Sequence, residues 1–256
     1  MKDQNDYNVR AIERALQILD CFNEEHTERS LTEIVKLVGL HKATTHRIMT
    51  TLLNSGYLEH TPDGQKFRLG LHLASLGFIV INKMDLRSEA YPFMSQLTQQ
   101  LDEACDLSVF DQDHVFYVEV MQSRHTLRIA AAIGQRLPAY CTASGKLFLA
   151  FLPEPKLEAI LNQPMKSHTN NTITSSALLR PQLDVIRQQG YAVDDEEYEV
   201  GIRAVAAPIR NREGSVIAAI SIPSPTSRMT PDRIPAVAEV LKEMTDKVSH
   251  RMGWQI

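Results

Sequence analysis

The sequence has few cysteines and no long hydrophobic run. Its three cysteines, Cys21, Cys105 and Cys141, lie far apart and form no CxxC pair, which excludes a disulfide framework and a zinc site built on thiolates. The longest apolar stretch, residues 73–81, is far shorter than the roughly 20 residues that a membrane-spanning helix needs. The opening MKDQNDYN also lacks the hydrophobic region of a signal peptide, and we therefore expect a cytoplasmic protein.

The chain also lacks a strong excess of charge of either sign. Its formal net charge is −4 and its pI is about 6.1, which argues against a protein that binds polyanions over its whole surface but allows a local basic patch. Hydrophobic residues (43%) and charged residues (23%) are close to globular averages, so extensive disorder is not expected. At 256 residues the chain is long enough for two domains, each with its own core.

The pattern along the chain predicts three parts. Residues 1–70 are typical of short helices followed by a hairpin, and residues 71–84 form an apolar run at helical spacing. Residues 85–256 alternate between strands and helices. We therefore expect an α+β protein with a small N-terminal module, a connecting helix and a larger C-terminal domain.

The first two predicted helices follow from spacing and from end signals. Apolar residues recur at helical spacing in an opening helix that ends around residues 23–29, and these are Val9, Ile12, Ala15, Leu16 and Leu19. Ser30 and Glu33 have the spacing of a capping box, which begins a second helix. Gly39 can adopt the left-handed conformation that ends this helix.

A third helix and a hairpin complete the pattern of a winged helix. The third helix places Thr45, Ile48, Met49 and Leu52 on one face and ends at residues 54–56. Two strand-like segments, residues 57–60 and 66–69, flank a turn at residues 61–64. A plain three-helix domain stabilised by a hairpin is the alternative interpretation.

The outward face of the third helix is small, polar and basic, as a helix in the DNA major groove requires. No carboxylate occurs in residues 40–55, and residues 36–70 contain five basic and two acidic side chains, a net charge of +3. We expect Lys66 and Arg68 to contact phosphate or reach toward the minor groove, Lys42 to position the helix, and Thr44, Arg47 and His46 to read bases. The full candidate DNA-binding set is His41, Lys42, Ala43, Thr44, His46, Arg47, Thr50, Lys66 and Arg68.

Strand and helix patterns in residues 85–256 indicate an antiparallel sheet flanked by helices. The expected strands are residues 107–110, 115–121, 127–133, 205–209 and 216–222, and the expected helices are residues 144–151, 177–189 and 231–252.

Five segments together resemble the IclR family of bacterial transcriptional regulators over essentially the whole length. They are residues 9–16 (VRAIERAL), residues 31–58 ending in LNSGYL, residues 67–70 (FRLG), residues 137–146 (LPAYCTASGK) and residues 194–208 (DDEEYEVGIRAVAAP). The resemblance implies a dimeric or tetrameric DNA-binding regulator with an N-terminal winged helix, a linker helix and a C-terminal GAF-like effector-binding domain. Its partners would be double-stranded operator DNA and a small-molecule effector, and no cofactor is implied.

The resemblance also implies where the effector binds. The implied lining residues are Ile129, Leu137, Ala143, Ser144, Asp194, Ala204 and Ser221. Residues 143–145 begin a predicted helix, whose free N–H groups favour a carboxylate. Ala204 and Pro223 stand where many members of the family have Cys and Ser, so we expect a more apolar cavity and an aromatic or longer carboxylate.

Other functions compete with a repressor controlled by a small organic acid. The acidic run at residues 194–197 has no histidine at ligand spacing, so we expect no metal site. Cys141 or Ser144 could act as a nucleophile with His114, His125 or His168, but no nucleophile motif surrounds them, so we do not expect an enzyme. An activator or a ligand-independent architectural DNA-binding protein is a further alternative. For any of these DNA-binding proteins, the opening helix and residues 71–81 are the expected dimer surfaces.

Overall fold

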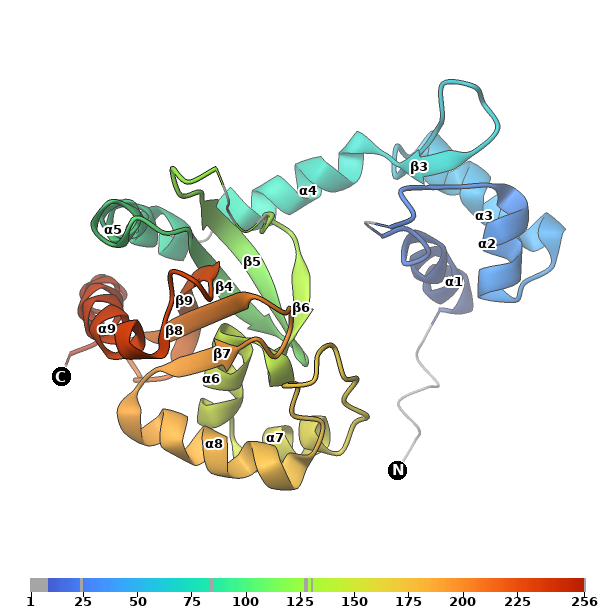
Figure 1. Cartoon of the computed structure of the whole chain (residues 1–256). Coiled ribbons are helices and arrows are strands. Elements are labelled where there is room, and N and C mark those ends of the chain that lie inside the picture. The colour runs from blue at the N-terminus through green and yellow to red at the C-terminus, as the bar shows by residue number, and fades with distance from the viewer. Residues whose placement is uncertain (1–8, 24, 83–84, 127–128, 130, 256) are drawn as a thin grey trace. The chain divides into compact units, whose positions relative to one another are not determined.

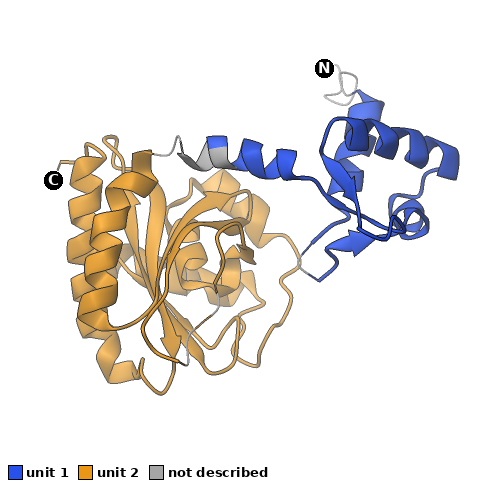
Figure 2. Cartoon of the chain, turned by 90° about the horizontal axis from the view of Figure 1, so that it is seen from above, with its two compact units in different colours: residues 1–83 blue, residues 84–256 orange. Residues whose placement is uncertain are grey.

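The computed structural model describes residues 9–23, 25–82, 85–126, 129 and 131–255. The chain divides into two compact units, residues 1–83 and residues 84–256 (Figure 2). Each unit has its own hydrophobic core. No described helix is long and apolar enough to cross a membrane.

The first unit is a winged helix. Its elements in chain order are α1 (Arg10–Leu19), β1 (Glu28–Arg29), α2 (Leu31–Val38), α3 (Lys42–Asn54), β2 (Leu58–His60), β3 (Phe67–Leu69) and α4 (Leu71–Asn82). The strands form an antiparallel sheet in the order β1-β3-β2. Buried Ile18, Ile34, Met49 and Leu58 pack together as the centre of this unit's core.

Local signals explain where the helices of this unit begin and end. Ser30 and Glu33 form the expected capping box: the Ser30 side chain accepts the N–H of Glu33, and the Glu33 carboxylate accepts the N–H of Ser30 at 2.7 Å. Gly39 ends α2 in the left-handed region, with a φ of 65°. A Cβ atom at Gly70 would lie 2.1 Å from the carbonyl oxygen of Gly56, so only glycine allows the wing to pack against the end of α3.

Two features of this unit differ from the sequence prediction. The opening helix ends at Leu19 and not around residues 23–29, and Glu28 and Arg29 form a short third strand that pairs with β3. The predicted apolar stripe is only partly buried: Ala15 and Leu19 are half-buried against the core, while Val9, Ile12 and Leu16 are more than half exposed. The fully buried residue of α1 is Ile18, which the prediction did not include. The exposed half of the stripe faces away from the core of its own unit.

The second unit is a six-stranded antiparallel sheet with helices on both faces (Figure 1). The strand order is β6-β5-β4-β9-β8-β7, with β4 (Cys105–Asp111), β5 (His114–Met121), β6 (Arg136–Pro138), β7 (Ala192–Asp195), β8 (Ile202–Arg210) and β9 (Val216–Pro225). Helices α5 (Asp85–Leu101) and α9 (Ile234–Arg251) cover one face. The other face carries the short helix η2 (Ala139–Cys141) and α6 (Ala143–Phe151), α7 (Glu154–Leu161) and α8 (Ser176–Gln189).

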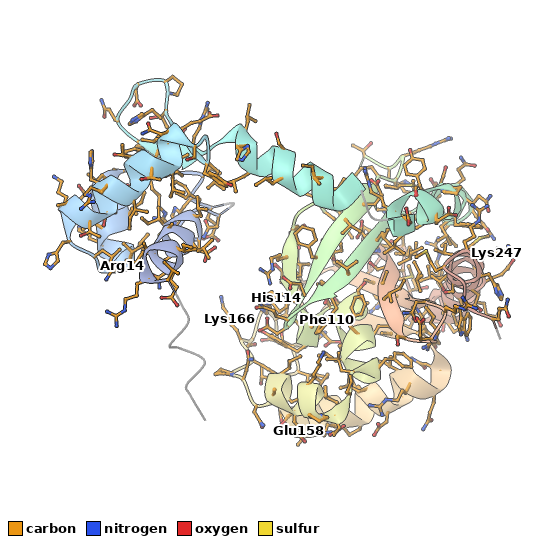
Figure 3. The ribbon with its side chains drawn as sticks, turned by 180° about the vertical axis from the view of Figure 1, so that it is seen from behind. Arg14, Phe110, His114, Glu158, Lys166 and Lys247 are labelled. Atoms are coloured by element: carbon orange, nitrogen blue, oxygen red, sulfur yellow. The ribbon has the colours of Figure 1, made fainter. Side chains whose placement is uncertain are left out.

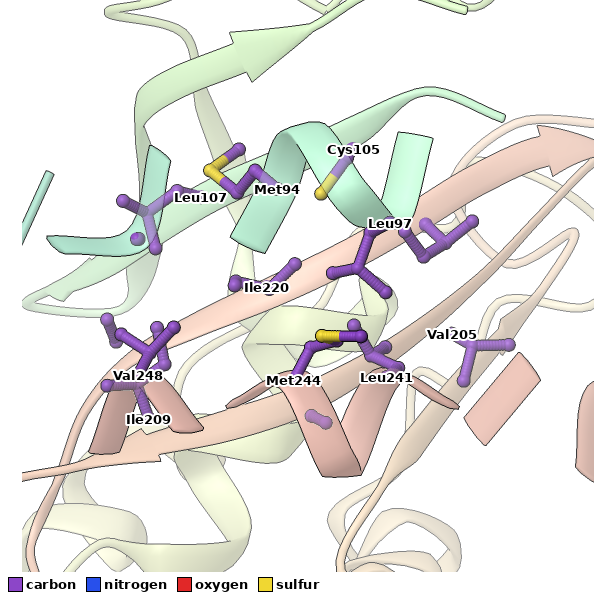
Figure 4. Packing of buried hydrophobic residues seen from close by; sticks show 14 of the residues in the cluster. Met94, Leu97, Cys105, Leu107, Val205, Ile209, Ile220, Leu241, Met244 and Val248 are labelled. Carbon is purple, nitrogen blue, oxygen red and sulfur yellow. The ribbon is translucent and has the colours of Figure 1, made fainter. Parts of the chain in front are cut away.

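Side chains alternate between the two faces along each strand, so the sheet contributes to a hydrophobic core on each face. Leu107 of β4 and Ile220 of β9 point toward α5 and α9, where they meet Met94 and Leu241 (Figure 4). The opposite face of the sheet carries Ala206 of β8 and Ala219 of β9, which leave room for α6 to approach the sheet closely. The candidate cavity described below lies on this α6 face.

The sequence prediction for residues 127–133 does not hold in the part that is described. Residues 127, 128 and 130 lie outside the described residues, and the described ones between 129 and 133 form no strand. The edge strand is instead β6, which pairs with the start of β5. Strand β7 and helix α7 were not anticipated, and residues 231–252 begin as a 3-10 turn, η3 (Pro231–Arg233), before α9.

Candidate functional site

Helix α3 presents two different faces. Thr45, Met49 and Leu52 are buried in the core of the first unit. Of the predicted DNA-binding residues on this helix and at its start, Thr44 is half-buried and the others are exposed: His41, Lys42, Ala43, His46, Arg47 and Thr50. The Thr50 hydroxyl already donates to the carbonyl of His46 at 2.9 Å, so Lys42, His46 and Arg47 are the side chains best able to contact a ligand.

The wing, residues 58–69, contains the two remaining predicted DNA-binding residues, Lys66 and Arg68, and their surroundings differ. Lys66 is exposed at the start of β3. Arg68 is opposite Glu59 in the β2–β3 register, and its guanidinium lies 3.1 Å from the Glu59 carboxylate. Glu59 also accepts the N–H of Leu71 at 3.3 Å, which fixes the start of α4. Arg68 therefore already pairs within the wing, whereas Lys66 presents its charge to solvent.

Sequence reasoning missed one basic residue beside α3. A small cavity of about 280 Å³ lies between α1 and α3, and its lining residues are Ala11, Arg14, Thr44, Arg47, Ile48 and Thr51. Arg14 (labelled in Figure 3) and Arg47 thus face the same hollow, and no acidic residue lines it. The signal was present as the matching helical faces of α1 and α3, but it was hidden by the acidic character of residues 1–35.

The second unit contains a cavity of about 480 Å³ between the sheet and the start of α6. All seven residues of the candidate effector set line it: Ile129, Leu137, Ala143, Ser144, Asp194, Ala204 and Ser221. Sequence reasoning missed several polar lining residues, namely Asp106, Tyr117, Gln135, Thr142, Tyr198 and Glu199. Ala204 and Pro223 contribute apolar surface as expected, while these other residues make the cavity more polar than those two positions suggest.

The start of α6 is built to hold a polar group. The Thr142 hydroxyl accepts the N–H of Gly145 at 3.3 Å, and the N–H groups of Ala143 and Ser144 belong to the first turn, which has no carbonyl partner within the helix. The Ser144 hydroxyl is buried and has no hydrogen-bond partner among the described residues. A Cβ atom at Gly145 would lie 2.3 Å from the backbone of Ala139, so this helix start packs directly on η2.

Two buried carboxylates face the same cavity. Asp106 on β4 and Asp194 on β7 are each at most 5% exposed. Burial raises the pKa of both side chains to about 7. Asp194 accepts the N–H of Glu197 at 2.8 Å, whereas Oδ1 of Asp106 has no hydrogen-bond partner in the described part of the chain. The predicted strand began at residue 107, one position after Asp106, so nothing in the sequence pattern indicated that this carboxylate faces the cavity.

A buried ion pair connects α6 to a neighbouring turn. The Lys146 ammonium donates to the Glu197 carboxylate and, at 3.2 Å, to the side chain of Gln182 on α8. Both charged side chains are almost completely buried. The pair joins α6 to the turn after β7, and β7 itself carries Asp194.

The described residues are not arranged as the metal-site and nucleophile alternatives would require. Within the acidic run Asp195 pairs with Arg203, and Glu196 accepts the N–H of Gly201, so the run does not converge on one point. No group of three or more metal-ligating side chains occurs among the described residues. Burial raises the pKa of the Cys141 thiol to about 12, which keeps it protonated.

The three candidate bases contact other groups. His114 pairs with Asp113 at 2.6 Å, His125 pairs with Asp102 at 3.2 Å, and His168 lies 3.2 Å from the Tyr140 hydroxyl. None of them lines the cavity that contains Ser144.

Comparison with known proteins gives consistent matches along the chain. The model described as "Bacterial transcriptional regulator IclR C-terminal" matches residues 78–250, and the model described as "IclR helix-turn-helix domain" matches residues 11–62. The HTH-type transcriptional regulator XynR of Escherichia coli is 36% identical over 96% of this chain and 98% of its own length. The transcriptional repressor IclR of Escherichia coli is 32% identical over 93% of this chain and 89% of its own.

Solved structures agree with these matches. The crystal structure of an IclR homologue from Microbacterium hydrocarbonoxydans, complexed with 4-hydroxybenzoate, is similar with a TM-score of 0.81 and 27% identity. The similarity covers 94% of this chain and 98% of that one.

Proposed function

Because the chain belongs to the IclR family of bacterial transcriptional regulators, we propose that it is a repressor whose affinity for operator DNA is changed by a small organic acid. In this proposal α3 and the wing contact DNA, and the acid binds in the cavity at the start of α6. The three parts of the chain are a DNA-binding domain (residues 1–70), a linker helix (residues 71–84) and an effector-binding and oligomerisation domain (residues 85–256). A relative that is named as a repressor supports the sign of the regulation.

The observation that carries the proposal is the exposed face of α3. It is free of carboxylates, it presents Lys42, His46 and Arg47, and it lies on a helix whose opposite face is buried. Donors on a narrow helix can reach base edges in the major groove, and lysine or arginine on the flanking wing can neutralise phosphates. Helices α1 and α2 each carry one acidic side chain, Glu13 and Glu33, whereas α3 carries none.

The effector part of the proposal depends on the cavity. The cavity is of the size that small-molecule sites have, and it contains the unpaired first turn of α6. A similar protein has been solved in complex with 4-hydroxybenzoate, which is a small organic acid. These features support an acid as the ligand class.

The proposal includes a homodimer or a tetramer. A single winged helix covers one short half-site, so specific recognition of an operator needs two copies about 34–36 Å apart or a multiple of that distance. Exposed apolar side chains are present on both expected dimer surfaces: Val9, Ile12 and Leu16 at the start of α1 and on it, and Leu71, Leu76 and Ile79 on α4. Such a concentration of exposed large apolar residues is typical of a protein interface.

The DNA-binding assignment is tested on genomic fragments that the purified chain selects from its own genome. With one such fragment in a fluorescence anisotropy titration, Lys66→Ala should weaken binding to all sequences and reduce the salt slope by about 1. Arg47→Ala should weaken binding and also change the selected sequence. Lys247→Ala, which removes an exposed lysine of α9, is the control and should behave as wild type.

Unchanged affinity and unchanged sequence preference in a folded Arg47→Ala, Lys66→Ala double variant would overturn the assignment of this surface to DNA.

A further inference from the structure

Two buried side-chain atoms in the effector cavity, the Ser144 hydroxyl oxygen and Oδ1 of Asp106, have no hydrogen-bond partner among the described residues. The Ser144 hydroxyl lies at the first turn of α6, where it adds a donor to the free N–H groups of that turn. Oδ1 of Asp106 lies on β4 and can only accept when the carboxylate is ionised. Both residues line the same cavity, and both are about 98% buried or more. The cavity therefore offers hydrogen-bond donors at the first turn of α6 with Ser144, which we call the donor end, and an acceptor at Asp106, which we call the acceptor end.

Leaving such groups unpaired is costly, because a buried polar group without a partner loses its hydration and gains nothing in return. The donor end fits an anion, since the first turn of a helix carries partial positive charge. The acceptor end fits a ligand group that donates a hydrogen bond. A carboxylate ligand that carried only carbon and hydrogen elsewhere would satisfy the first end and leave Asp106 unpaired.

The acceptor end extends over several strands of the sheet. Asp106 on β4 is directly opposite Ser221 on β9, and Tyr117 on β5 and Asp194 on β7 also line the cavity. One phenolic hydroxyl can contact only part of this surface. A row of aliphatic hydroxyl groups can donate to the carboxylates and also accept from Ser221 and Tyr117, whereas an ammonium group can only donate.

From this arrangement we propose that the effector is an aliphatic carboxylic acid with several hydroxyl groups, of the aldonic acid type, and that Asp106 determines this specificity. The carboxylate of the ligand binds at the first turn of α6, beside Ser144. Hydroxyl groups further along its chain donate to Asp106 and contact Ser221. This inference rests on the proposed effector function of the cavity and names the ligand class for it.

The test is isothermal titration calorimetry of the full chain with ligands that differ in one feature. The panel contains aldonates of four to six carbons, including D-gluconate, and four comparison compounds. Hexanoate lacks the hydroxyl groups, and D-glucitol lacks the carboxylate. 6-Aminohexanoate carries one terminal ammonium and no hydroxyl group, and 4-hydroxybenzoate has a single phenolic hydroxyl. The tightest aldonate should bind at least about tenfold more tightly than each of these, because a hydrogen bond to a charged group contributes that much or more.

Any comparison compound that binds as tightly as the best aldonate would overturn the inference.

A variant pair then tests the part assigned to Asp106. Asp106→Asn keeps the shape of the side chain but removes the charged acceptor, so the preference for the aldonate over hexanoate should fall by about tenfold or more. The control is Ser108→Ala, which removes a buried and unpartnered hydroxyl from the same strand at a position that does not line the cavity. Ser108→Ala should keep the preference. An Asp106→Asn variant that is folded and retains the full preference would contradict the specificity role.

Operator binding separates this inference from the proposed function. If hexanoate or 4-hydroxybenzoate changes operator affinity and no aldonate does, the effector function holds and the ligand class is wrong. If an aldonate binds the cavity without changing operator affinity, the ligand class holds and regulation through the cavity is wrong. If no compound of the panel binds, both are wrong.

Discussion

At the scale of single residues, two buried carboxylates line the cavity, Asp106 and Asp194, and neither forms a salt bridge within the described part of the chain. Burial raises the pKa of Asp106 and Asp194 from 3.8 to about 7, so each ionises near neutral pH in the folded chain and well below it in the unfolded chain. The charged groups that act on Asp194 are Glu197 and Lys146, while Tyr117 is the titratable neighbour of Asp106 and stays neutral because its own pKa is raised.

This difference predicts a pH dependence of stability. Between pH 4 and pH 7 the folded chain binds more protons at Asp106 than the unfolded chain does, so the free energy of unfolding falls as pH rises through this window and is level above it. Asp106→Asn removes the effect. Its free energy of unfolding relative to wild type should therefore be about 2 to 3 kcal/mol higher at pH 8 than at pH 5. Urea denaturation at both pH values measures this gain.

Asp111→Asn, at the exposed end of the same strand, serves as the control and should show no such gain. A difference between wild type and Asp106→Asn that is the same at pH 5 and pH 8 would show that Asp106 does not titrate in this range.

A second prediction at this scale concerns Arg14. It shares the hollow between α1 and α3 with Arg47, and a phosphate of the DNA backbone fits between two guanidinium groups. Arg14→Ala should weaken binding to all DNA sequences and lower the salt slope by about 1, without changing the preferred sequence. Arg180→Ala, an exposed arginine on α8 that pairs with Glu154 and Glu158, is the matched control for anisotropy titrations over a salt series.

A salt slope that is unchanged in Arg14→Ala would remove Arg14 from the DNA-binding surface.

At the scale of elements, the position of α6 depends on Lys146 and Glu197. Removing one partner of a buried ion pair leaves the other charge without compensation, which costs about 3 to 5 kcal/mol, while replacing both by apolar groups costs much less. Lys146→Met should therefore destabilise the chain strongly, and the Lys146→Met, Glu197→Leu double variant should recover most of the loss. The free energy of unfolding from urea titrations distinguishes the two variants, and a double variant no more stable than Lys146→Met would contradict the ion-pair account.

The sequence was informative about elements whose signals are local. The capping box at Ser30, the left-handed Gly39 and the glycine at position 145 can be read from a few neighbouring residues, and the structure has each of them in the expected element. The family motifs likewise indicated residues that line one cavity, although these lie on different strands and helices.

Features that depend on distant partners could not be predicted in the same way. Lys146 and Glu197 are 51 positions apart, and nothing in the spacing of either residue indicates that they meet. Strand β1 is only two residues long, and it forms because its residues pair with the free edge of β3. The inward position of Asp106 depends on the register of β4 against β9, which is a property of the whole sheet.

At the scale of the whole molecule, the first unit leaves large apolar side chains of α1 exposed. Ile12 and Leu16 are more than half exposed on one stripe of α1, and burying them against a second copy would be favourable. An Ile12→Glu, Leu16→Glu variant should sediment as a smaller species than wild type at micromolar concentration and should bind operator DNA more weakly. Leu178→Glu, on α8, changes an equally exposed leucine outside this stripe and should leave the assembly unchanged.

Analytical ultracentrifugation decides this prediction. A wild-type chain that is monomeric at micromolar concentration both with and without DNA would contradict it.

The central claim is that an acid in the cavity of the second unit changes DNA binding by the first unit. The most direct measurement is operator affinity by fluorescence anisotropy for wild type and for Ser144→Phe, which fills the cavity, with a panel of aldonates, hexanoate, 4-hydroxybenzoate and pyruvate. We predict that at least one acid shifts the wild-type Kd by about 5- to 150-fold and that Ser144→Phe binds the operator normally without any shift. If no acid shifts the wild-type Kd, or if the shift is equally large in Ser144→Phe, the claim is contradicted.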